Sequence, residues 1–214
     1  MKIAVFGCSW SYGVKTQGSY NDNKIYSNWP FYLHQQTGWE IKNYSFGGTC
    51  IAWSINNLLS FKEKYKDYKI IFQATSPHRY TYIKSNHNTF SQREEYNEYE
   101  YYSKSLKGLE CINLSRLTNT EQSNYFVKTL ELYPEKYYNN YIHMQKNIIE
   151  KFSDIFFTHT YNTKKYFQDW PCMQQYFDKD FDNWVFDNGH HFNKDGLKAQ
   201  AEYIKELVNA SRAS

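Results

Sequence analysis

Four short segments with the character of strands, separated by stretches with helical periodicity, constrain the fold of this 214-residue chain most strongly. They are rich in β-branched and aromatic residues, which is typical of buried strands. The segments are Lys2–Phe6, Trp39–Tyr44, Tyr68–Gln73 and Asp154–Thr158, with Trp184–Asp187 as the poorest candidate for a fifth. Strands that alternate with helices predict a parallel sheet covered on both faces. We therefore expect a three-layer α/β/α sandwich of about five strands, flavodoxin-like, in which ligands bind beyond the carboxyl ends of the strands.

The helical stretches carry their own start signals and apolar stripes. Ser27 or Asn28 caps a helix over residues 29–37, with Pro30 in its first turn. Further helices are predicted over residues 51–65, 137–152 and 197–208, the last with an inner stripe of Leu197, Ala201, Ile204 and Val208.

Ser9 lies in a glycine-bounded turn directly after the first predicted strand. Residues 7–13 read Gly-Cys-Ser-Trp-Ser-Tyr-Gly, so Gly7 and Gly13 bracket the serine. A serine on a sharp strand-to-helix turn projects its Oγ from the carboxyl edge of the sheet, where the first amides of the next helix also point. A serine nucleophile is presented in this way, although glycine and serine are also ordinary turn residues.

A histidine pair near the other end supplies the imidazole that a serine nucleophile needs. His190 and His191 follow Asp187 and precede the closing helix. In a serine hydrolase the imidazole takes the Oγ proton, and a neighbouring group orients the imidazole. An acid three or four residues before a histidine in a turn can do this locally. The alternative is a pair of surface histidines without a catalytic role.

A third glycine-bearing loop follows the second predicted strand. Residues 43–49 read Asn-Tyr-Ser-Phe-Gly-Gly-Thr. A loop of this kind is suited to donating a backbone N–H to an oxyanion.

Together these three blocks resemble those of the SGNH/GDSL hydrolase family in order and spacing, over residues 2 to about 208. The resemblance implies a metal-free and cofactor-free serine hydrolase. It places the nucleophile at Ser9 and the oxyanion-hole glycine at Gly48, counted from Asn43. The backbone N–H of Ser9 is implied as a further oxyanion donor.

The resemblance also shows where this chain departs from the family pattern. Cys8 stands where the family usually has aspartate, which leaves the nucleophile itself untouched. The family pattern has a further block that supplies an oxyanion-hole asparagine, and in this chain it maps onto residues 70–79. Here Ala74 replaces a glycine and Ser76 replaces that asparagine. A serine hydroxyl still donates one hydrogen bond but is shorter than the amide. Since a lost oxyanion donor costs about 10²–10³ in rate, we expect poor turnover of generic esters.

The last block fits the family pattern in two registers. Counting back from Gly196, His191 takes the place of the catalytic histidine and Asn188 that of its partner. A strict Asp-x-x-His spacing instead pairs Asp187 with His190. The Phe-Asn-x-x-Gly sequence that follows sets the start of the closing helix and favours His191. Asp187 then reaches the imidazole if the turn is one residue wider, and otherwise Asn188 leaves the site closer to a Ser-His dyad.

Composition and charge point to one domain and exclude several classes of partner. The length suits a single core, and the net charge of +3 is spread out with no basic run, so nucleic acid is not expected. No apolar stretch approaches the roughly 20 residues of a membrane span, and no signal peptide is evident, so we expect a cytoplasmic protein. Four cysteines without paired spacing suggest neither a zinc site nor a disulfide framework. The bias towards Tyr, Asn, Lys and Ile is common in phage genomes.

The segment at about residues 80–136 is long for one connection and is rich in tyrosine. We expect an insertion or lid here, since long loops often serve as lids or substrate-binding elements. Exposed tyrosines there would suit a carbohydrate ester. His78 and Arg79, just before it, are candidates for contacting an anionic group of the substrate, with a structural ion pair as the alternative for Arg79.

The sequence therefore favours a serine esterase that cleaves acetyl or short-chain O-acyl esters through an acyl-enzyme. His191 serves as the base, with Asp187 as its partner, and Gly48 and Ser76 complete the oxyanion hole. Two alternatives remain: a binding or structural protein that has lost turnover, and an acyltransferase or thioesterase that uses the same Ser-His centre. The sequence is silent on the oligomeric state.

Overall fold

The computed structural model describes residues 1–12, 28–45, 49–64, 66–75, 79–83, 91–96, 99–104, 109–113, 135–159, 161–177, 184 and 192–213. The strands are β1 (Lys2–Phe6), β2 (Glu40–Asn43), β3 (Lys69–Ala74), β4 (Arg79–Ile83), β5 (Ser91–Tyr96), β6 (Tyr99–Lys104), β7 (Leu109–Asn113) and β8 (Ile155–Thr158). The helices are α1 (Ser9–Tyr12), α2 (Trp29–Thr37), α3 (Ile51–Lys64), α5 (Glu135–Phe152), α6 (Tyr161–Lys164), α7 (Met173–Phe177) and α9 (Lys194–Ala213).

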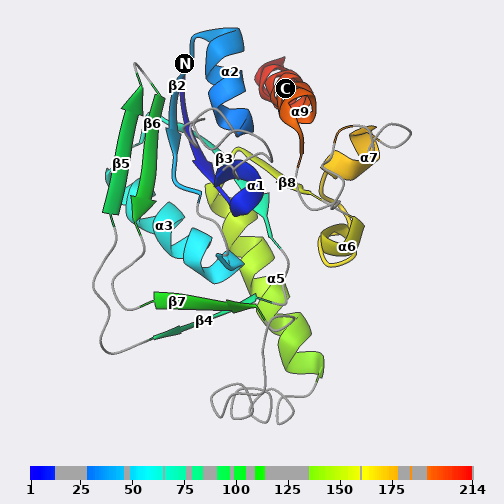
Figure 1. Ribbon diagram of the computed structural model, residues 1–214. Coiled ribbons are helices and arrows are strands. Elements are labelled where there is room, and N and C mark those ends of the chain that lie inside the picture. The colour runs from blue at the N-terminus through cyan, green and yellow to red at the C-terminus, as the bar shows by residue number, and fades with distance from the viewer. Residues whose placement is uncertain are drawn as a thin grey trace.

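The central sheet has the strand order β5-β6-β2-β1-β3-β8 (Figure 1). The five strands from β6 to β8 run parallel, and β5 is antiparallel to β6 at the edge. Helices cover both faces, with α3 and α5 on one side and α2 and α9 on the other (Figure 1). The predicted three-layer α/β/α sandwich with about five parallel strands is confirmed.

Alternate residues of β1 face opposite layers, as the twofold period of a strand requires. Ile3 and Val5 belong to the core cluster that includes residues of α2 and α9. Ala4 and Phe6 belong to the cluster that includes residues of α3 and α5. All four are fully buried. A sheet buried on both faces explains why β1 is apolar throughout its interior instead of alternating with polar residues.

The register of the parallel strands brings their carboxyl ends to one edge. Val5 lies opposite Asn43, the last residue of β2, and Phe6 lies opposite Phe72 in β3. Ala74, which ends β3, lies opposite Thr158, which ends β8. The residues that follow β1, β2, β3 and β8 are therefore gathered at the same edge, as expected for a ligand-binding α/β sheet.

The helix signals read from the sequence are confirmed at α2 and α9. Asn28 caps α2 by accepting a hydrogen bond from Phe31 N–H at 2.9 Å, and Pro30 lies in the first turn. The predicted inner stripe of α9 is buried throughout: Leu197, Ala201, Ile204 and Val208.

The described residues contain a fifth parallel strand that the sequence did not suggest. Among the described residues it is β6, from the segment at about residues 80–136. Trp184 lies in no strand, and the rest of that range is outside the described residues. The same segment contributes β5 at the edge of the sheet and the separate antiparallel pair of β4 and β7. Part of the expected insertion therefore extends the central sheet.

Candidate functional site

Ser9 is the first residue of α1, three residues after Phe6, which ends β1. Its side chain is half-buried, whereas Gly7 and Cys8 before it are buried. Ser11 N–H donates to Cys8 O at 3.0 Å and closes the turn. The serine therefore sits on the strand-to-helix turn that the sequence predicted, at the carboxyl edge of the sheet. We call residues 7–11, which carry the predicted nucleophile, the nucleophile turn.

Gly7 allows the nucleophile turn to lie directly against β3. A Cβ at this position would lie 2.9 Å from Ser11 Oγ and 3.1 Å from both Cβ and Oε1 of Gln73. Contacts this short leave no room for a side chain, because packed interiors hold few voids and resist added methyl groups. Position 7 therefore requires a glycine, because the backbone there lies directly against the side chains of Ser11 and Gln73.

The loop after β2 contacts the nucleophile turn at both of its described ends. Asn43 Nδ2 donates to Ser11 O at 2.8 Å, and Asn43 Oδ1 accepts from Ser45 N–H at 3.0 Å. Thr49 Oγ1 donates to Gly7 O at 3.3 Å. Thr49 is therefore hydrogen-bonded directly to the turn that carries Ser9, and Ser45 is linked to the same turn through Asn43.

Gln73 joins β3 to the nucleophile turn inside the protein. Its Oε1 accepts a short hydrogen bond from Ser11 Oγ, and Ser11 Oγ in turn accepts from Trp29 Nε1 at 3.0 Å. The side chains of Ser11, Gln73 and Trp29 are all buried. Buried polar groups are costly unless they are hydrogen-bonded, so this arrangement holds the turn in one geometry.

His159, directly after β8, is a site residue that the sequence reasoning missed. It is 2% exposed, and its Nδ1 lies 2.7 Å from Gln73 Nε2. Its ring lies against Trp10, with centroids 3.7 Å apart. The signal was available, because a polar residue that directly follows a predicted parallel strand lies at the carboxyl edge of the sheet.

The segment before α9 reaches the nucleophile turn through Phe192. The Phe192 ring lies 5.3 Å from the Trp10 ring and 5.1 Å from the His159 ring, measured between centroids. Asn193 then caps α9, because its Oδ1 accepts from the N–H groups of Asp195 and Gly196 at 3.1 and 2.9 Å. The predicted role of the Phe-Asn-x-x-Gly sequence in starting this helix is confirmed.

Several predicted site residues lie outside the described residues, so the structure does not test their roles. They are Gly13, Gly48, Ser76, His78, Asp187, Asn188, His190 and His191. Arg79 is the first residue of β4 and pairs with Asn113 of β7. The catalytic, oxyanion-hole and substrate-binding assignments of these residues stay predictions.

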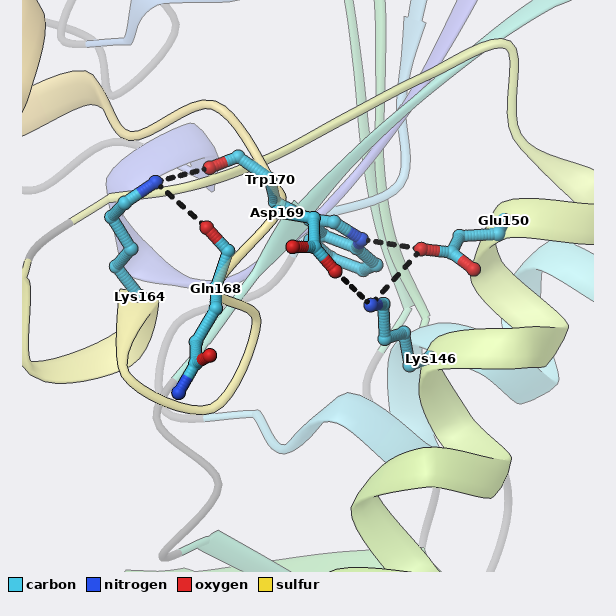
Figure 2. Close-up of polar contacts among 6 residues, drawn as sticks. All are labelled: Lys146, Glu150, Lys164, Gln168, Asp169 and Trp170. Carbon is cyan, nitrogen blue, oxygen red and sulfur yellow. Dashed lines mark hydrogen bonds and ion pairs between the residues drawn. The ribbon is translucent and has the colours of Figure 1, made fainter.

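The chain that follows His159 is folded back onto α5 by a network of polar contacts (Figure 2). Trp170 Nε1 donates to Glu150 at 2.8 Å, and Lys146 Nζ lies 3.0 Å from Asp169 and 3.7 Å from Glu150. The hydrogen bond and charge of Asp169, together with the charge of Glu150, raise the pKa of Lys146 above its ordinary value. Lys164 Nζ donates to the carbonyls of two residues in the same loop.

This fold-back returns the chain to the end of β8. Thr158 N–H donates to Pro171 O at 2.8 Å, and Gln174 N–H donates to His159 O at 3.0 Å. The backbone on both sides of the His159 ring is therefore bonded to the returning segment. The position of His159 is set by the chain before it and by the chain after the loop.

The described side chains at this edge are mostly uncharged hydroxyl and amide groups: Ser9, Ser11, Asn43, Ser45, Thr49, Gln73 and Thr75. Within the described part of the chain, no group of three or more His, Cys, Asp or Glu residues is placed to hold a metal ion. Nor does any helix in that part have the length and apolar character needed to cross a bilayer.

Comparison with solved structures finds an esterase and a lipolytic protein. The psychrotrophic esterase EstA from Pseudoalteromonas sp. matches at 10% identity and a TM-score of 0.47, covering 97% of this chain and 98% of that one. A protein from Desulfitobacterium hafniense DCB-2, described as lipolytic and of the G-D-S-L family, matches at 15% identity and a TM-score of 0.41, covering 100% and 99%. The chain is structurally similar to these proteins.

No family model matches the chain, and no curated protein matches its sequence. At such low identities and TM-scores, the likenesses by themselves assign no activity to this chain.

Proposed function

We propose that this protein hydrolyses O-acyl esters through an acyl intermediate on Ser9, with His191 as the general base. The contact between Trp10 and Phe192, with ring centroids 5.3 Å apart, carries the proposal. Trp10 follows Ser9 in the chain, and Phe192 follows His191. Since adjacent Cα atoms are about 3.8 Å apart, this contact supports the proposal that the two reacting residues act at the same edge of the sheet.

The reaction uses the two residues in turn. His191 removes the proton from Ser9 Oγ as the oxygen attacks the carbonyl carbon of the ester. When the tetrahedral intermediate collapses, the bond to the leaving alkoxide breaks and the imidazolium returns its proton to that oxygen. His191 then deprotonates a water molecule, which attacks the acyl-enzyme carbonyl. As the bond to Ser9 Oγ breaks and the acid is released, the imidazolium returns its proton to Ser9 Oγ. Asp187 or Asn188 orients the imidazole.

The developing oxyanion is stabilised by hydrogen-bond donors from three strand ends. The backbone N–H groups of Ser9 and Gly48 and the hydroxyl of Ser76 are the proposed donors. The bond from Thr49 to Gly7 O supports the second of these, because it holds the residue after Gly48 beside the nucleophile turn. The burial of Thr75 at the end of β3 supports the third, since Ser76 follows it directly.

Acetyl and short-chain esters, including those of carbohydrates, are the proposed substrates, with a lid formed by part of the segment at about residues 80–136. His78 and Arg79 are proposed to contact an anionic group of the substrate. The departures at Ser76 and Asn188 lead us to expect low rates on simple esters.

The test measures hydrolysis of p-nitrophenyl acetate and butyrate by the wild type and by Ser9→Ala, His191→Ala and His190→Ala. Labelling of Ser9 by a serine-directed phosphonate is followed by mass spectrometry on the same proteins. We expect Ser9→Ala and His191→Ala to lower kcat/KM by about a thousandfold or more, because each removes a reacting group. His190→Ala is expected to retain most of the activity. Ser60→Ala and His143→Ala, at exposed positions on α3 and α5, are the matched controls.

The outcomes separate the competing assignments. Loss of activity in His190→Ala but not in His191→Ala would move the base to His190, with Asp187 as its partner. A larger loss in Asp187→Asn than in Asn188→Ala would identify Asp187 as the orienting residue. If the wild type neither turns over esters nor becomes labelled at Ser9, the esterase proposal is wrong and a binding role replaces it. Transfer of the acyl group to an added alcohol would instead identify an acyltransferase.

A further inference from the structure

Three rings meet between the nucleophile turn and the segment that leads into α9. Trp10 and His159 have centroids 3.7 Å apart, Trp10 and Phe192 5.3 Å, and His159 and Phe192 5.1 Å. Each ring therefore contacts the other two. Trp10 is the chain neighbour of Ser9 and Phe192 that of His191, whereas His159 comes from a third strand end. We call Trp10, His159 and Phe192 the ring cluster.

A buried chain of hydrogen bonds sets the orientation of the His159 ring. Trp29 Nε1 donates to Ser11 Oγ, Ser11 Oγ donates to Gln73 Oε1, and Gln73 Nε2 lies 2.7 Å from His159 Nδ1. An amide nitrogen only donates, so His159 Nδ1 must accept and the neutral ring carries its proton on Nε2. All four side chains are at most 2% exposed.

This chain of hydrogen bonds is anchored in the nucleophile turn itself. Ser11 lies two residues after Ser9, and its carbonyl also accepts from Asn43 Nδ2. Gly7 lies beside both side chains, because a Cβ at this position would lie 2.9 Å from Ser11 Oγ and 3.1 Å from Gln73 Oε1. A displacement of Gln73 would therefore be transmitted to the turn that carries Ser9 and to the ring cluster.

We propose that His159 is a positioning residue for the reaction of Ser9 with His191. This inference rests on the proposed function. Held by Gln73, the His159 ring packs against Trp10 and Phe192 and so sets the separation of the two segments that carry the reacting residues. It acts through its neighbours and makes no contact with the substrate. Misplacement of reacting groups by about 1 Å can lower a rate by about 10², so small shifts in this cluster matter.

The chemistry of the site explains why a histidine serves better here than a phenylalanine. Both rings would pack against Trp10 and Phe192, but only the imidazole offers an acceptor to Gln73 Nε2. Without that acceptor the buried amide loses a partner, which is costly in a low-dielectric interior. The imidazole therefore combines ring packing with a fixed orientation.

The test compares steady-state kinetics of His159→Phe, which keeps a ring but removes the acceptor, with Gln73→Leu and the double variant. We expect kcat to fall about 10- to 100-fold with KM within about twofold of the wild type, because positioning is lost and substrate contacts remain. The double variant should be no slower than the slower single variant, since both changes break the same hydrogen bond. Gln145→Leu, at a buried glutamine of α5 outside this edge, is the matched control and should leave kcat unchanged.

A spectroscopic measurement tests the orientation of His159 independently of turnover. In ¹⁵N NMR spectra of the histidine rings, wild-type His159 is expected as the neutral form with its proton on Nε2. Gln73→Glu replaces the donating NH₂ by an accepting carboxylate, so His159 should gain a proton on Nδ1. An Nδ1-protonated ring in the wild type, or no change in Gln73→Glu, would overturn the proposed hydrogen-bond chain.

The failure of this inference is distinguishable from the failure of the proposed function. If the wild type hydrolyses esters and is labelled at Ser9, but His159→Phe and Gln73→Leu keep the wild-type kcat, only the positioning role is wrong. The same holds if these variants lose thermal stability with no change in kcat, because His159 would then be purely structural. If the wild type shows neither turnover nor labelling, the esterase proposal fails and the positioning role fails with it.

Discussion

At the nucleophile turn, position 7 tolerates only glycine because the chain passes directly beside Ser11 and Gln73. The glycine was expected from the turn before Ser9, on local grounds. Its actual neighbour is Gln73, 66 residues further along the chain, which contacts the turn because β1 and β3 are adjacent in the sheet. The sequence therefore predicted a glycine at this turn, but it did not reveal the contact with Gln73 that requires one.

We predict that Gly7→Ala lowers both stability and activity. The added Cβ would lie 2.9 Å from Ser11 Oγ, so the hydrogen bonds of Ser11 must shift. Forcing a methyl group into a packed interior typically costs about 1–3 kcal/mol. Thermal unfolding should show the loss of stability, and phosphonate labelling of Ser9 should slow.

Gly38→Ala is the control for this prediction. Gly38 ends α2 with φ 66° and has open space around its Cα, so alanine there is strained without a clash. We expect about 1–2 kcal/mol of destabilisation and an unchanged labelling rate. Wild-type stability and labelling in Gly7→Ala would contradict the close contact.

Among the elements, α9 shows how a local signal determines a boundary. The apolar stripe placed the helix over residues 197–208, whereas α9 begins at Lys194 because Asn193 caps it. The start of the helix matters for the site, since Phe192 lies directly before the cap and belongs to the ring cluster.

We predict that Asn193→Ala destabilises the protein by about 1 kcal/mol, because the N–H groups of Asp195 and Gly196 lose their side-chain acceptor. Chemical denaturation monitored by circular dichroism measures this difference. Asn193→Asp keeps an acceptor oxygen and should remain within a few tenths of a kcal/mol of the wild type. Equal stability of the two variants would show that the cap contributes nothing.

The strands β5 and β6 form a hairpin that was not predicted from the sequence. The run from Ser91 to Lys104 holds four tyrosines among polar residues, and two residues separate the strands, a loop length typical of a hairpin. This run was interpreted only as part of a tyrosine-rich insertion. The pairing of β6 with β2 joins segments more than 50 residues apart, and no local pattern specifies such a pairing.

At the scale of the whole molecule, stability depends on the sheet being covered on both faces. Ile70 and Ile71 are adjacent in β3 and are fully buried, yet they belong to different core clusters. Ile70 packs in the cluster that includes α3 and α5, whereas Ile71 packs in the one that includes α2 and α9.

We predict that Ile70→Ala and Ile71→Ala each destabilise the protein by about 2–5 kcal/mol, since each leaves a cavity in a packed core. Both should unfold in one cooperative transition, because the same strand carries both residues. Lys66→Ala, at an exposed position before β3, is the control and should change little. Calorimetry makes the comparison, and a second transition in either variant would show that the two layers unfold independently.

The sequence by itself determined the α/β/α class, four strands within one or two residues of their ends in the structure, and the position of Ser9 on a strand-to-helix turn. These features depend on short-range periodicity, glycine placement and capping, which act between residues close in the chain. The tertiary structure alone decided that Gln73 and His159 lie beneath that turn and that Trp10 meets Phe192. Those contacts join residues that are 62 to 182 positions apart in the chain. They form because the strand order and the packing of both helical layers bring the carboxyl ends of β1, β3 and β8 to one edge of the sheet.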